Sequence, residues 1–429
     1  MTLRDGVLTD SQGRLLAGND ADVWSVLSRA FKCVEIDQIE GRPAGYAPGW
    51  YGYLGYELGR HTERLPGKAV RDTSFPDLRL GFYDSVLVFD ALEKSWSLVW
   101  LDWSGHPMHG GGDAHGLLSE TAHAARDSLD GFPCPVEQAS GHTLPIAEYC
   151  PNFSPEQYKK TVARCVEYIA EGDIFQVNLS QRLAVKEAPD PLDIYRVLRI
   201  RNPSWYAAYL GFDCDSQPCA IASCSPELFL RVQGDHVLTR PVKGTMPRVG
   251  DATRDRASAK ELVSSIKDNA ELAMIIDLLR NDLGRVCSFR SIRVSEPRRL
   301  EIHPTVFHLV GSIQGRLRSQ MGLADLIRAT FPGGSITGAP KIRAMEIIDE
   351  LEPVARGVYT GSIGHAGVDG HAEWSIAIRT IVCQSNTAYV QAGGGIVADS
   401  TPEGEYAETL DKARGMLEAL AEARVSAST

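Results

Sequence analysis

The sequence predicts an α+β fold, and two patterns along the chain support this. Short runs rich in β-branched and aromatic residues dominate, and long amphipathic segments interrupt them at irregular intervals. The regular strand–helix alternation of a doubly wound sheet does not occur. With 429 residues, the chain can bury a large core and form two domains or one elaborate domain.

Composition and charge exclude several classes of function. The net charge of -11 predicts no basic surface for nucleic acid or for an anionic membrane. The 9 cysteines are scattered and include no CxxC pair, which argues against a disulfide framework and a zinc site. No apolar run approaches ~18 residues, and the N-terminus lacks the apolar segment of a signal peptide. We therefore expect a soluble protein of the reducing cytoplasm.

Residues 1–144 are expected to form an N-terminal region that ends in a linker. Leu80 to Trp103 contains two apolar runs around a polar turn, which is typical of a β-hairpin. The Gly- and His-rich stretch from about 104 to 144 has no flanking order that would fix a metal geometry, so we interpret it as a linker. A second domain is placed at residues 145–429.

The second domain opens with a clear helix signal. Ser154 is a good N-cap, Gln157 completes a capping box, and Gly172 ends the apolar stripe that follows. Three strands are then expected, within QVNLSQRLAV, PCAIASCS and PELFLRVQ.

Lys243 stands at the end of a predicted strand, in LTRPVKGTMPR. Pro241 fixes the backbone before it, and Gly244 allows another group to approach closely. A solvated lysine is the usual interpretation of such a position. A nucleophilic lysine would need its pKa lowered by roughly 3 units, and burial near Arg240 and Arg248 would act in that direction.

Two predicted helices, one from about Ala257 and one from about Glu403, each present a pair of carboxylates three residues apart. The pairs are Asp268 with Glu271, and Glu405 with Glu408. Ordinary solvated faces, with Lys267–Glu271 and Glu408–Lys412 as ion pairs, are one interpretation. If the two pairs face one cavity, they instead form an all-oxygen site suited to Mg²⁺.

Two glycine-rich turns lie between these helices. FPGGSITGAPK leads into a helix with its cap expected near Thr337 or Gly338, but Ala339 stands where a Walker phosphate loop requires lysine. The second turn, QAGGGIVADS, has a flexible backbone that suits an anion. Arg379, on the strand before it, is a candidate bidentate clamp for a carboxylate.

Taken together, these segments resemble the chorismate-utilising enzymes, and within them the aminodeoxychorismate synthase component I subfamily. The resemblance covers nearly all of residues 150–420. It rests on GDIFQVNLSQR, SPE, RPVKGT, AELAMIIDLLRNDLGRV, FPGGSITGAPKIRAMEIIDELEP, YTGSIG, IAIRT, GGGIVADS and EYAETLDKA.

The resemblance implies two large, mainly antiparallel sheets packed as a sandwich, with helices outside and the site between the sheets. It assigns Lys243 as the nucleophile, Glu227 as the general acid/base, and Glu271 and Glu408 as Mg²⁺ ligands with Asp268 and Glu405 around them. The positions that would line the substrate site are His308, Ser335, Tyr359, Arg379, Gly393 and Gly395.

The implied reaction converts chorismate and ammonia to 4-amino-4-deoxychorismate for para-aminobenzoate and folate synthesis. The ammonia would come from a partner glutaminase subunit, because the chain has no cysteine in a GxCxG-like turn. Two positions depart from the family pattern: His365 replaces an aromatic residue, and Asp268 replaces a glutamate.

Three alternatives remain open at this point. Anthranilate synthase component I typically has alanine in place of Lys243, and an LLES-type motif that this chain lacks. Isochorismate and salicylate synthases use the lysine to activate water, and their QVNLSQR and GSIG segments differ. A catalytically silent chorismate-binding subunit would not need to retain Lys243 and Glu227.

Overall fold

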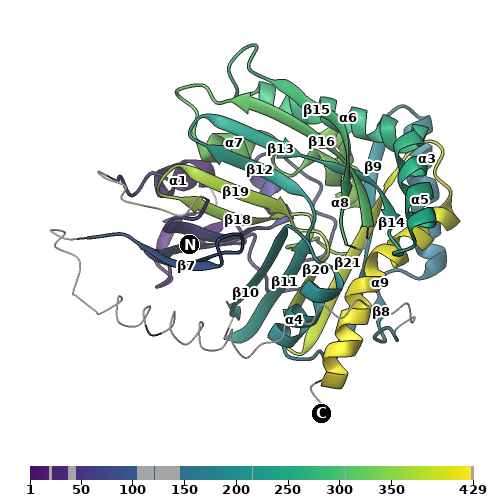
Figure 1. The fold of residues 1–429 in the computed structure, drawn as a ribbon, viewed down its shortest axis with the longest axis horizontal. Coiled ribbons are helices and arrows are strands. Elements are labelled where there is room, and N and C mark those ends of the chain that lie inside the picture. Colours follow the sequence, from purple (N-terminus) through teal and green to yellow (C-terminus); the bar gives the residue numbers. More distant parts are fainter. Residues whose placement is uncertain are drawn as a thin grey trace.

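A computed structural model describes residues 1–18, 22–36, 45–103, 120, 145–214, 216–304 and 306–426. Strands form the centre of the molecule and helices lie around them, which confirms the α+β class (Figure 1). The predicted linker, apart from residue 120, and the domain boundary near residue 144 lie outside the described residues.

Within this part of the chain, the largest sheet has 12 strands. It joins the N-terminal region to the rest of the protein, because β4 pairs antiparallel with β18 along its whole length. In spatial order its strands are β14 (Val242–Pro247), β16 (Val306–Arg316), β13 (His236–Arg240), β12 (Leu228–Gln233), β19 (His371–Ile376), β18 (Ser362–Gly367), β4 (Gly49–Leu54), β5 (Leu78–Tyr83), β1 (Thr2–Arg4), β2 (Val7–Thr9) and β3 (Leu15–Ala17), with β15 (Arg293–Ile302) also on β16.

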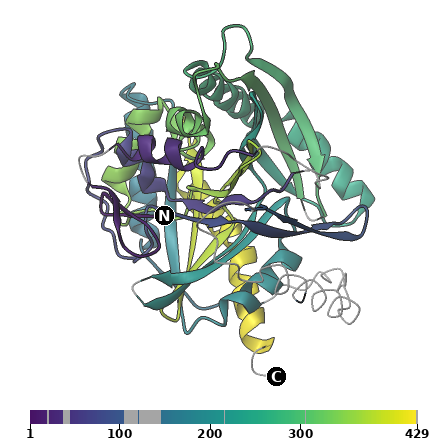
Figure 2. The same cartoon turned by 90° about the vertical axis from the view of Figure 1, so that its left-hand side faces the viewer.

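A second sheet of 7 strands in the described ranges is also antiparallel. Its strands in order are β10 (Tyr206–Cys214), β11 (Gln217–Ser225), β20 (Thr380–Gln384), β21 (Thr387–Ile396), β9 (Gln176–Lys186) and β17 (Gly338–Ala339), with β8 (Cys150–Pro151) beside β9. A separate hairpin of β6 (Ser85–Asp90) and β7 (Ser95–Trp100) extends from the body of the molecule (Figure 2). This hairpin confirms the one expected in this region.

The helices cover the outside of the sheets, and α9 runs along β21 (Figure 1). They are α1 (Val23–Ala30), α3 (Pro155–Ala170), α4 (Pro191–Arg201), α5 (Ala252–Ser264), α6 (Ile266–Gly284), α7 (Leu323–Thr330), α8 (Lys341–Leu351), α9 (Pro402–Ser426) and the 3-10 turns η1 (Tyr56–His61) and η2 (Gly334–Ile336). No helix in the described ranges is both long and apolar enough to cross a membrane.

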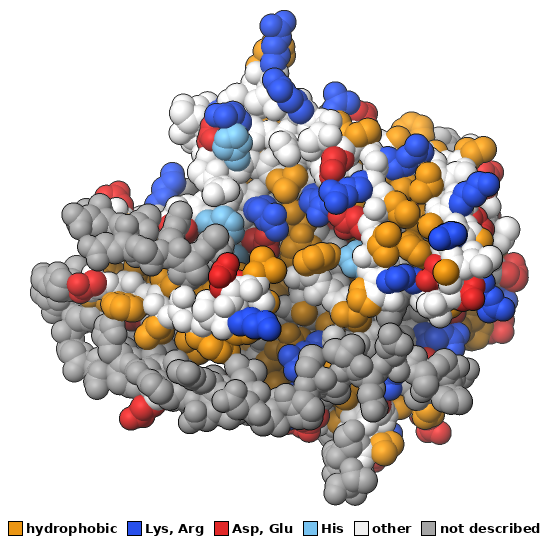
Figure 3. Space-filling view, viewed as in Figure 1, with side chains coloured by type: hydrophobic (Ala, Val, Ile, Leu, Met, Phe, Trp, Pro, Cys, Tyr) orange, Lys and Arg blue, Asp and Glu red, His pale blue; other side chains and the backbone are white. Residues whose placement is uncertain are grey.

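The two large sheets meet through aromatic and aliphatic side chains. Tyr53 of β4 stacks on Phe212 of β10 with ring centroids 5.9 Å apart, and Ile363 and Ile221 belong to the same buried cluster. Burying such side chains fixes the relative position of the sheets, and so of the residues between them. Among the described side chains on the face in Figure 3, Lys and Arg are interspersed with acidic and apolar residues.

Local signals in the sequence predicted several element boundaries correctly. Ser154 and Gln157 form the expected capping box at α3, and Gly172 follows the helix with φ +84°. The helix after the glycine-rich turn begins at Lys341 rather than near Thr337, because residues 334–336 first form a 3-10 turn. The helix expected from about Ala257 is in fact two helices, since Ser265 adopts an extended ψ of 115° between them.

Candidate active site

Lys243 lies on β14, where the strand bends away from regular pairing. It lies opposite Leu309 of β16, and the register shifts before Thr245. Gly244 allows this bend: its φ is +73°, and a Cβ there would lie 2.7 Å from Leu262 Cδ1 and 2.9 Å from Asp268 Oδ1. A larger residue would therefore displace either the strand or the candidate metal-site carboxylate.

The Lys243 residue is half-buried, and its amine lies within electrostatic reach of charged groups from the β11–β12 turn, α6 and α9. Burial lowers the pKa of Lys243, while the carboxylates of Glu271, Glu227 and Glu408 oppose that shift and the charge of Lys412 adds to it. The amine is therefore within electrostatic reach of Glu227 and of the two helix carboxylates. A lowered pKa increases the fraction of neutral, nucleophilic amine.

Glu227 lies in the turn between β11 and β12 and is buried, with 4% of its surface exposed. Burial raises the pKa of Glu227 to about 7, although a hydrogen bond from Ser335 and the charge of Lys243 oppose the rise. Ser335 Oγ donates to Glu227 Oε1 over 2.5 Å. A carboxyl group that titrates near neutrality can give up and take back a proton.

The carboxylates of α6 and α9 face each other across the same space. The charge of Glu408 raises the pKa of Glu271, and both carboxylates raise the pKa of Lys243. A Cβ on Gly394 would lie 2.7 Å from Glu405 Oε2 and 3.5 Å from Glu408 Oε1, so a side chain there would displace the Glu405 carboxylate.

The ion pairs expected within each helix also form. Lys412 Nζ lies 2.6 Å from Glu408 Oε1, and Lys267 Nζ lies 3.9 Å from Glu271 Oε1. The ion pairs of one interpretation therefore involve the same carboxylates that the other interpretation assigns to a metal.

These residues fit a hard divalent cation in their chemistry. All the candidate ligand atoms are oxygens, and the buried Glu405 Oε2 has no hydrogen-bond partner among the described residues. No group of three or more His, Cys, Asp or Glu in the described ranges is arranged to hold a metal. Mg²⁺ is commonly held by one or two carboxylates together with water or substrate oxygens, so Glu271 and Glu408 remain the predicted ligands.

Arg379 provides a positive charge beside α9, the helix that carries Glu408. It adopts a left-handed backbone, with φ +51°, and its Nη1 donates to the Lys412 carbonyl over 2.9 Å. Its charge influences the pKa values of Tyr359 and His308, so the three side chains lie near one another. Burial, His303 and Arg379 lower the pKa of His308 to about 3, so this imidazole is neutral near pH 7.

The glycines of β21 bring backbone close to Lys243. A Cβ on Gly395 would lie 3.5 Å from Lys243 Nζ and 2.6 Å from Gln176 Nε2. The carbonyl of Gly393 accepts a hydrogen bond of 2.9 Å from Lys412. Each predicted site residue except Gly393 thus contacts another member of the set or lies within electrostatic reach of one. Gly393 is connected to the set by its hydrogen bond with Lys412, which also pairs with Glu408. Their chemical roles remain predictions.

Reasoning from the sequence did not select Gln176, which lies in the same place. Its side chain is fully buried, and neither polar atom has a hydrogen-bond partner among the described residues. Such an unpaired amide beside Lys243 is available to a ligand. The residue belongs to the QVNLSQR segment, but only the fold reveals that its side chain points toward Gly395.

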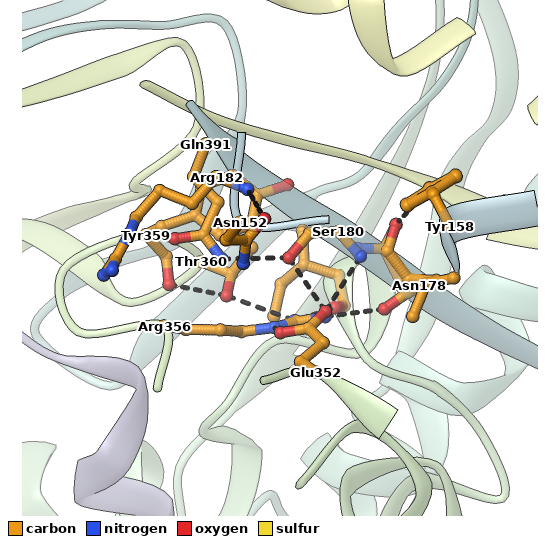
Figure 4. Close-up of polar contacts among 12 residues, drawn as sticks. Asn152, Tyr158, Asn178, Ser180, Arg182, Glu352, Arg356, Tyr359, Thr360 and Gln391 are labelled. Carbon is orange, nitrogen blue, oxygen red and sulfur yellow. Dashed lines mark hydrogen bonds and ion pairs between the residues drawn. The ribbon is translucent and has the colours of Figure 1, made fainter. Parts of the chain in front are cut away.

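A buried ion pair supports the wall that carries Tyr359 (Figure 4). Arg356 donates to both carboxylate oxygens of Glu352, over 2.7 and 2.9 Å, and also to the carbonyls of Asn178 and Ile336. Ser180 donates to the same carboxylate through its backbone and its hydroxyl, both over 2.8 Å. These bonds join β9, the loop with Ser335 and the segment with Tyr359 into one framework.

The N-terminal region reaches this framework through Glu57 of η1. Its carboxylate accepts the backbone N–H groups of Arg356 and Gly357 over 3.0 and 2.9 Å. Burial raises the pKa of Glu57 to about 7.

His365, which departs from the family pattern, lies in the large sheet. Its ring stacks on Tyr51 with centroids 5.2 Å apart, as an aromatic side chain expected at this position would.

Comparison with known proteins identifies the family. Residues 3–418 match the family described as chorismate binding enzyme. The chain belongs to this family. Aminodeoxychorismate synthase component 1 of Klebsiella aerogenes is 40% identical over 385 residues, which cover 89% of this chain and 80% of that protein. Anthranilate synthase component 1 of Thermus thermophilus is 41% identical over 372 residues, covering 87% and 77%.

A solved structure confirms the fold of this chorismate binding enzyme. Anthranilate synthase component I from Streptococcus pneumoniae superimposes with a TM-score of 0.79 at 32% identity, covering 97% of this chain and 89% of that one. The fold and the resemblance expected from the sequence are thus confirmed. Relatives with two different reaction names match at similar identity, so the comparisons support an enzyme acting on chorismate without choosing between those reactions.

Proposed function

We propose that the protein is an aminodeoxychorismate synthase that converts chorismate and ammonia to 4-amino-4-deoxychorismate, with Lys243 as a covalent nucleophile. One observation carries the proposal: an amine with a lowered pKa lies within electrostatic reach of Glu227, whose pKa is about 7. A nucleophile beside an acid of this kind suits displacement of a poor leaving group such as hydroxide.

Chorismate is a dicarboxylate, and this acidic protein must bind it through local positive charge. Arg379 supplies one cation beside the hydroxyl of Tyr359, and the backbone of β21 supplies close approach at Gly393 and Gly395. The neutral His308 imidazole adds a polar group to the site, and it does so without placing a further buried charge there. Glu271 and Glu408 would hold a Mg²⁺ ion, which when bound neutralises and orients the ring carboxylate.

In the first step, neutral Lys243 attacks C2 of the ring. The two ring double bonds shift, the C4–O bond breaks, and Glu227 gives its proton to the departing oxygen, which leaves as water. In the second step, ammonia attacks C4, the double bonds shift back, and the C2–N bond to Lys243 breaks. Glu227 recovers a proton from the new ammonium group, so the residues return to their starting state.

Lys243 argues against an anthranilate synthase, which the resemblance expects to carry alanine there. Isochorismate and salicylate synthases keep a lysine but use it to activate water, and their QVNLSQR and GSIG segments differ from those of this chain. A lysine that attacks C2 as the nucleophile is not available to activate water, whereas ammonia is nucleophilic without a base. The proposed role of Lys243 therefore favours ammonia as the second nucleophile.

The ammonia source is proposed to be a separate glutaminase subunit. The chain carries no cysteine within a GxCxG-like turn, so it lacks the nucleophile turn typical of a glutaminase. The proposed product leads to para-aminobenzoate and folate, and the chemistry suits the reducing cytoplasm expected from the sequence.

The test is a search for the covalent intermediate. Incubation with chorismate and Mg²⁺, without ammonia, should add a chorismate-derived mass that maps to the peptide containing Lys243. The Lys243→Ala variant should lack this mass, whereas the Lys160→Ala variant, which loses an exposed lysine of α3, should retain it. An adduct on another residue, or an equal adduct in Lys243→Ala, would overturn the role of Lys243.

A further inference from the structure

A buried ion pair lies at the base of the loop that carries Ser335. Lys341 Nζ donates to Asp282 Oδ2 over 2.5 Å and to the carbonyl of Thr330 over 2.8 Å. The Lys341 side chain is 13% exposed and that of Asp282 is 6% exposed. Removing both charges from water costs free energy, and only close contacts and further hydrogen bonds offset that cost. The loss of either partner of this pair is therefore more destabilising than the loss of a surface ion pair.

The position of Lys341 joins both ends of the loop. Thr330 is the last residue of α7 and Lys341 is the first of α8, so one ammonium group links the beginning and the end of the segment 331–340. Asp282, in the last turn of α6, holds that ammonium in place. Thr330 and Lys341, which flank the loop, form what we call its neck. The ammonium group of Lys341 ties these two ends together.

The body of the loop packs against the same helix. A Cβ on Gly334 would lie 2.7 Å from Leu278 Cδ2, which is one turn before Asp282 on α6. Phe331 also contacts Phe229 edge-on, with ring centroids 6.0 Å apart. Phe229 is two residues after Glu227 in the sequence. Glu271, a candidate metal ligand, is on α6 as well. One helix therefore supports both this candidate metal ligand and the loop that carries Ser335.

Ser335, at the centre of this loop, donates to Glu227 over 2.5 Å. We propose that Lys341, held by Asp282, is a positioning residue that fixes the neck of loop 331–340 and so keeps Ser335 hydrogen-bonded to Glu227. This inference rests on the proposed function, which assigns proton transfer to Glu227. It gives a role to two segments of the sequence, RNDLGRV and GAPK, that the reaction itself does not use.

The expected effect follows from the hydrogen bond. A donor to a carboxylate favours its ionised form, and Ser335 acts on Glu227 in this way together with the charge of Lys243 and the backbone N–H of Val242. If the neck loosens and Ser335 moves away, the pKa of Glu227 rises. The limb of the activity profile on which Glu227 loses its proton should then shift to higher pH by roughly 1 unit.

The experiment measures chorismate consumption against pH, at saturating Mg²⁺ and with rates corrected for free ammonia. Ser335→Ala sets the size of the shift, and Lys341→Met should reproduce it with kcat reduced by roughly tenfold or more. Lys341→Arg, which can still reach Asp282, should restore both values. Arg343→Met removes a cation from α8 that pairs with Asp173 at the surface, and should leave the profile unchanged.

Because Lys341→Met leaves a buried carboxylate without its partner, the Asp282→Asn/Lys341→Met variant is also measured. It removes both charges and should fold, yet keep the shifted profile. A wild-type profile in either folded variant, or an equal shift in Arg343→Met, would overturn the inference. Consumption is measured whatever the product, so an unexpected product would contradict the proposed function alone, and a limb insensitive to Ser335→Ala would contradict the role of Glu227.

Discussion

Replacing Glu227 with glutamine should stabilise the protein above neutral pH while it removes activity. The carboxyl pKa moves from its ordinary value of 4.5 to about 7 because the group is buried. At about 1.4 kcal/mol for each tenfold change in the proton equilibrium, that displacement corresponds to roughly 3 kcal/mol. Glutamine keeps an oxygen that can accept the hydrogen bond from Ser335 but never has to be ionised.

The direction of the pH dependence follows from the raised pKa. The stability associated with protonated Glu227 is fully present below pH 4.5, and it is lost as the pH rises to about 7. The Glu227→Gln variant lacks this loss. Its free energy of unfolding should therefore gain on wild type as the pH rises from 4.5 and level off above 7, where the gain reaches roughly 3 kcal/mol.

Urea unfolding followed by circular dichroism, in steps from pH 5 to pH 8.5, measures this difference. Glu171→Gln, an exposed residue after α3, provides the matched control and should give a difference that does not vary with pH. A constant difference between wild type and Glu227→Gln across the range would refute the buried, proton-exchanging carboxyl. A Glu227→Gln variant whose stability falls relative to wild type as the pH rises would refute it as well.

Three further outcomes are expected. Glu271→Gln and Glu408→Gln should each weaken Mg²⁺ binding in calorimetry and abolish turnover at limiting Mg²⁺ with the fold intact, and full activity in either would contradict the metal assignment. The purified chain should use ammonium salts, increasingly well at alkaline pH, but not glutamine, until a glutaminase subunit is added; glutamine-dependent amination by the chain alone would refute this. Arg356→Met should cost roughly 3–5 kcal/mol of stability in urea unfolding, since it strands Glu352 in a site where both side chains are at most 2% exposed; a loss below about 1 kcal/mol would be inconsistent with the framework.

Local chemistry explains what the sequence could predict of the fold. The capping box of Ser154 and Gln157 depends on residues three apart, so it can be recognised without any tertiary contact. The break at Ser265 was missed although it carries a local signal: the Ser265 side chain accepts a hydrogen bond from the backbone N–H of Asp268 and so caps the second helix. The pairing of β4 with β18 joins distant parts of the chain and has no local signal.

The site shows the same division. Asp268 and Glu271 are neighbours on one helix face, so their pairing follows from spacing, whereas their approach to Glu408 follows from the resemblance and is visible only in the fold. Gln176 and Lys341 were missed because amide and lysine side chains have many ordinary uses in a protein. Their significance lies in contacts with residues far along the chain, at Gly395 and Asp282.

The most direct test of the central claim is the identity of the product. Wild-type protein is incubated with chorismate, Mg²⁺ and an ammonium salt, and the products are separated and identified by mass spectrometry and NMR. The account predicts 4-amino-4-deoxychorismate, with no loss of pyruvate and no amination at C2, because Lys243 occupies C2 while ammonia attacks C4. Anthranilate, isochorismate or salicylate as the main product would contradict it.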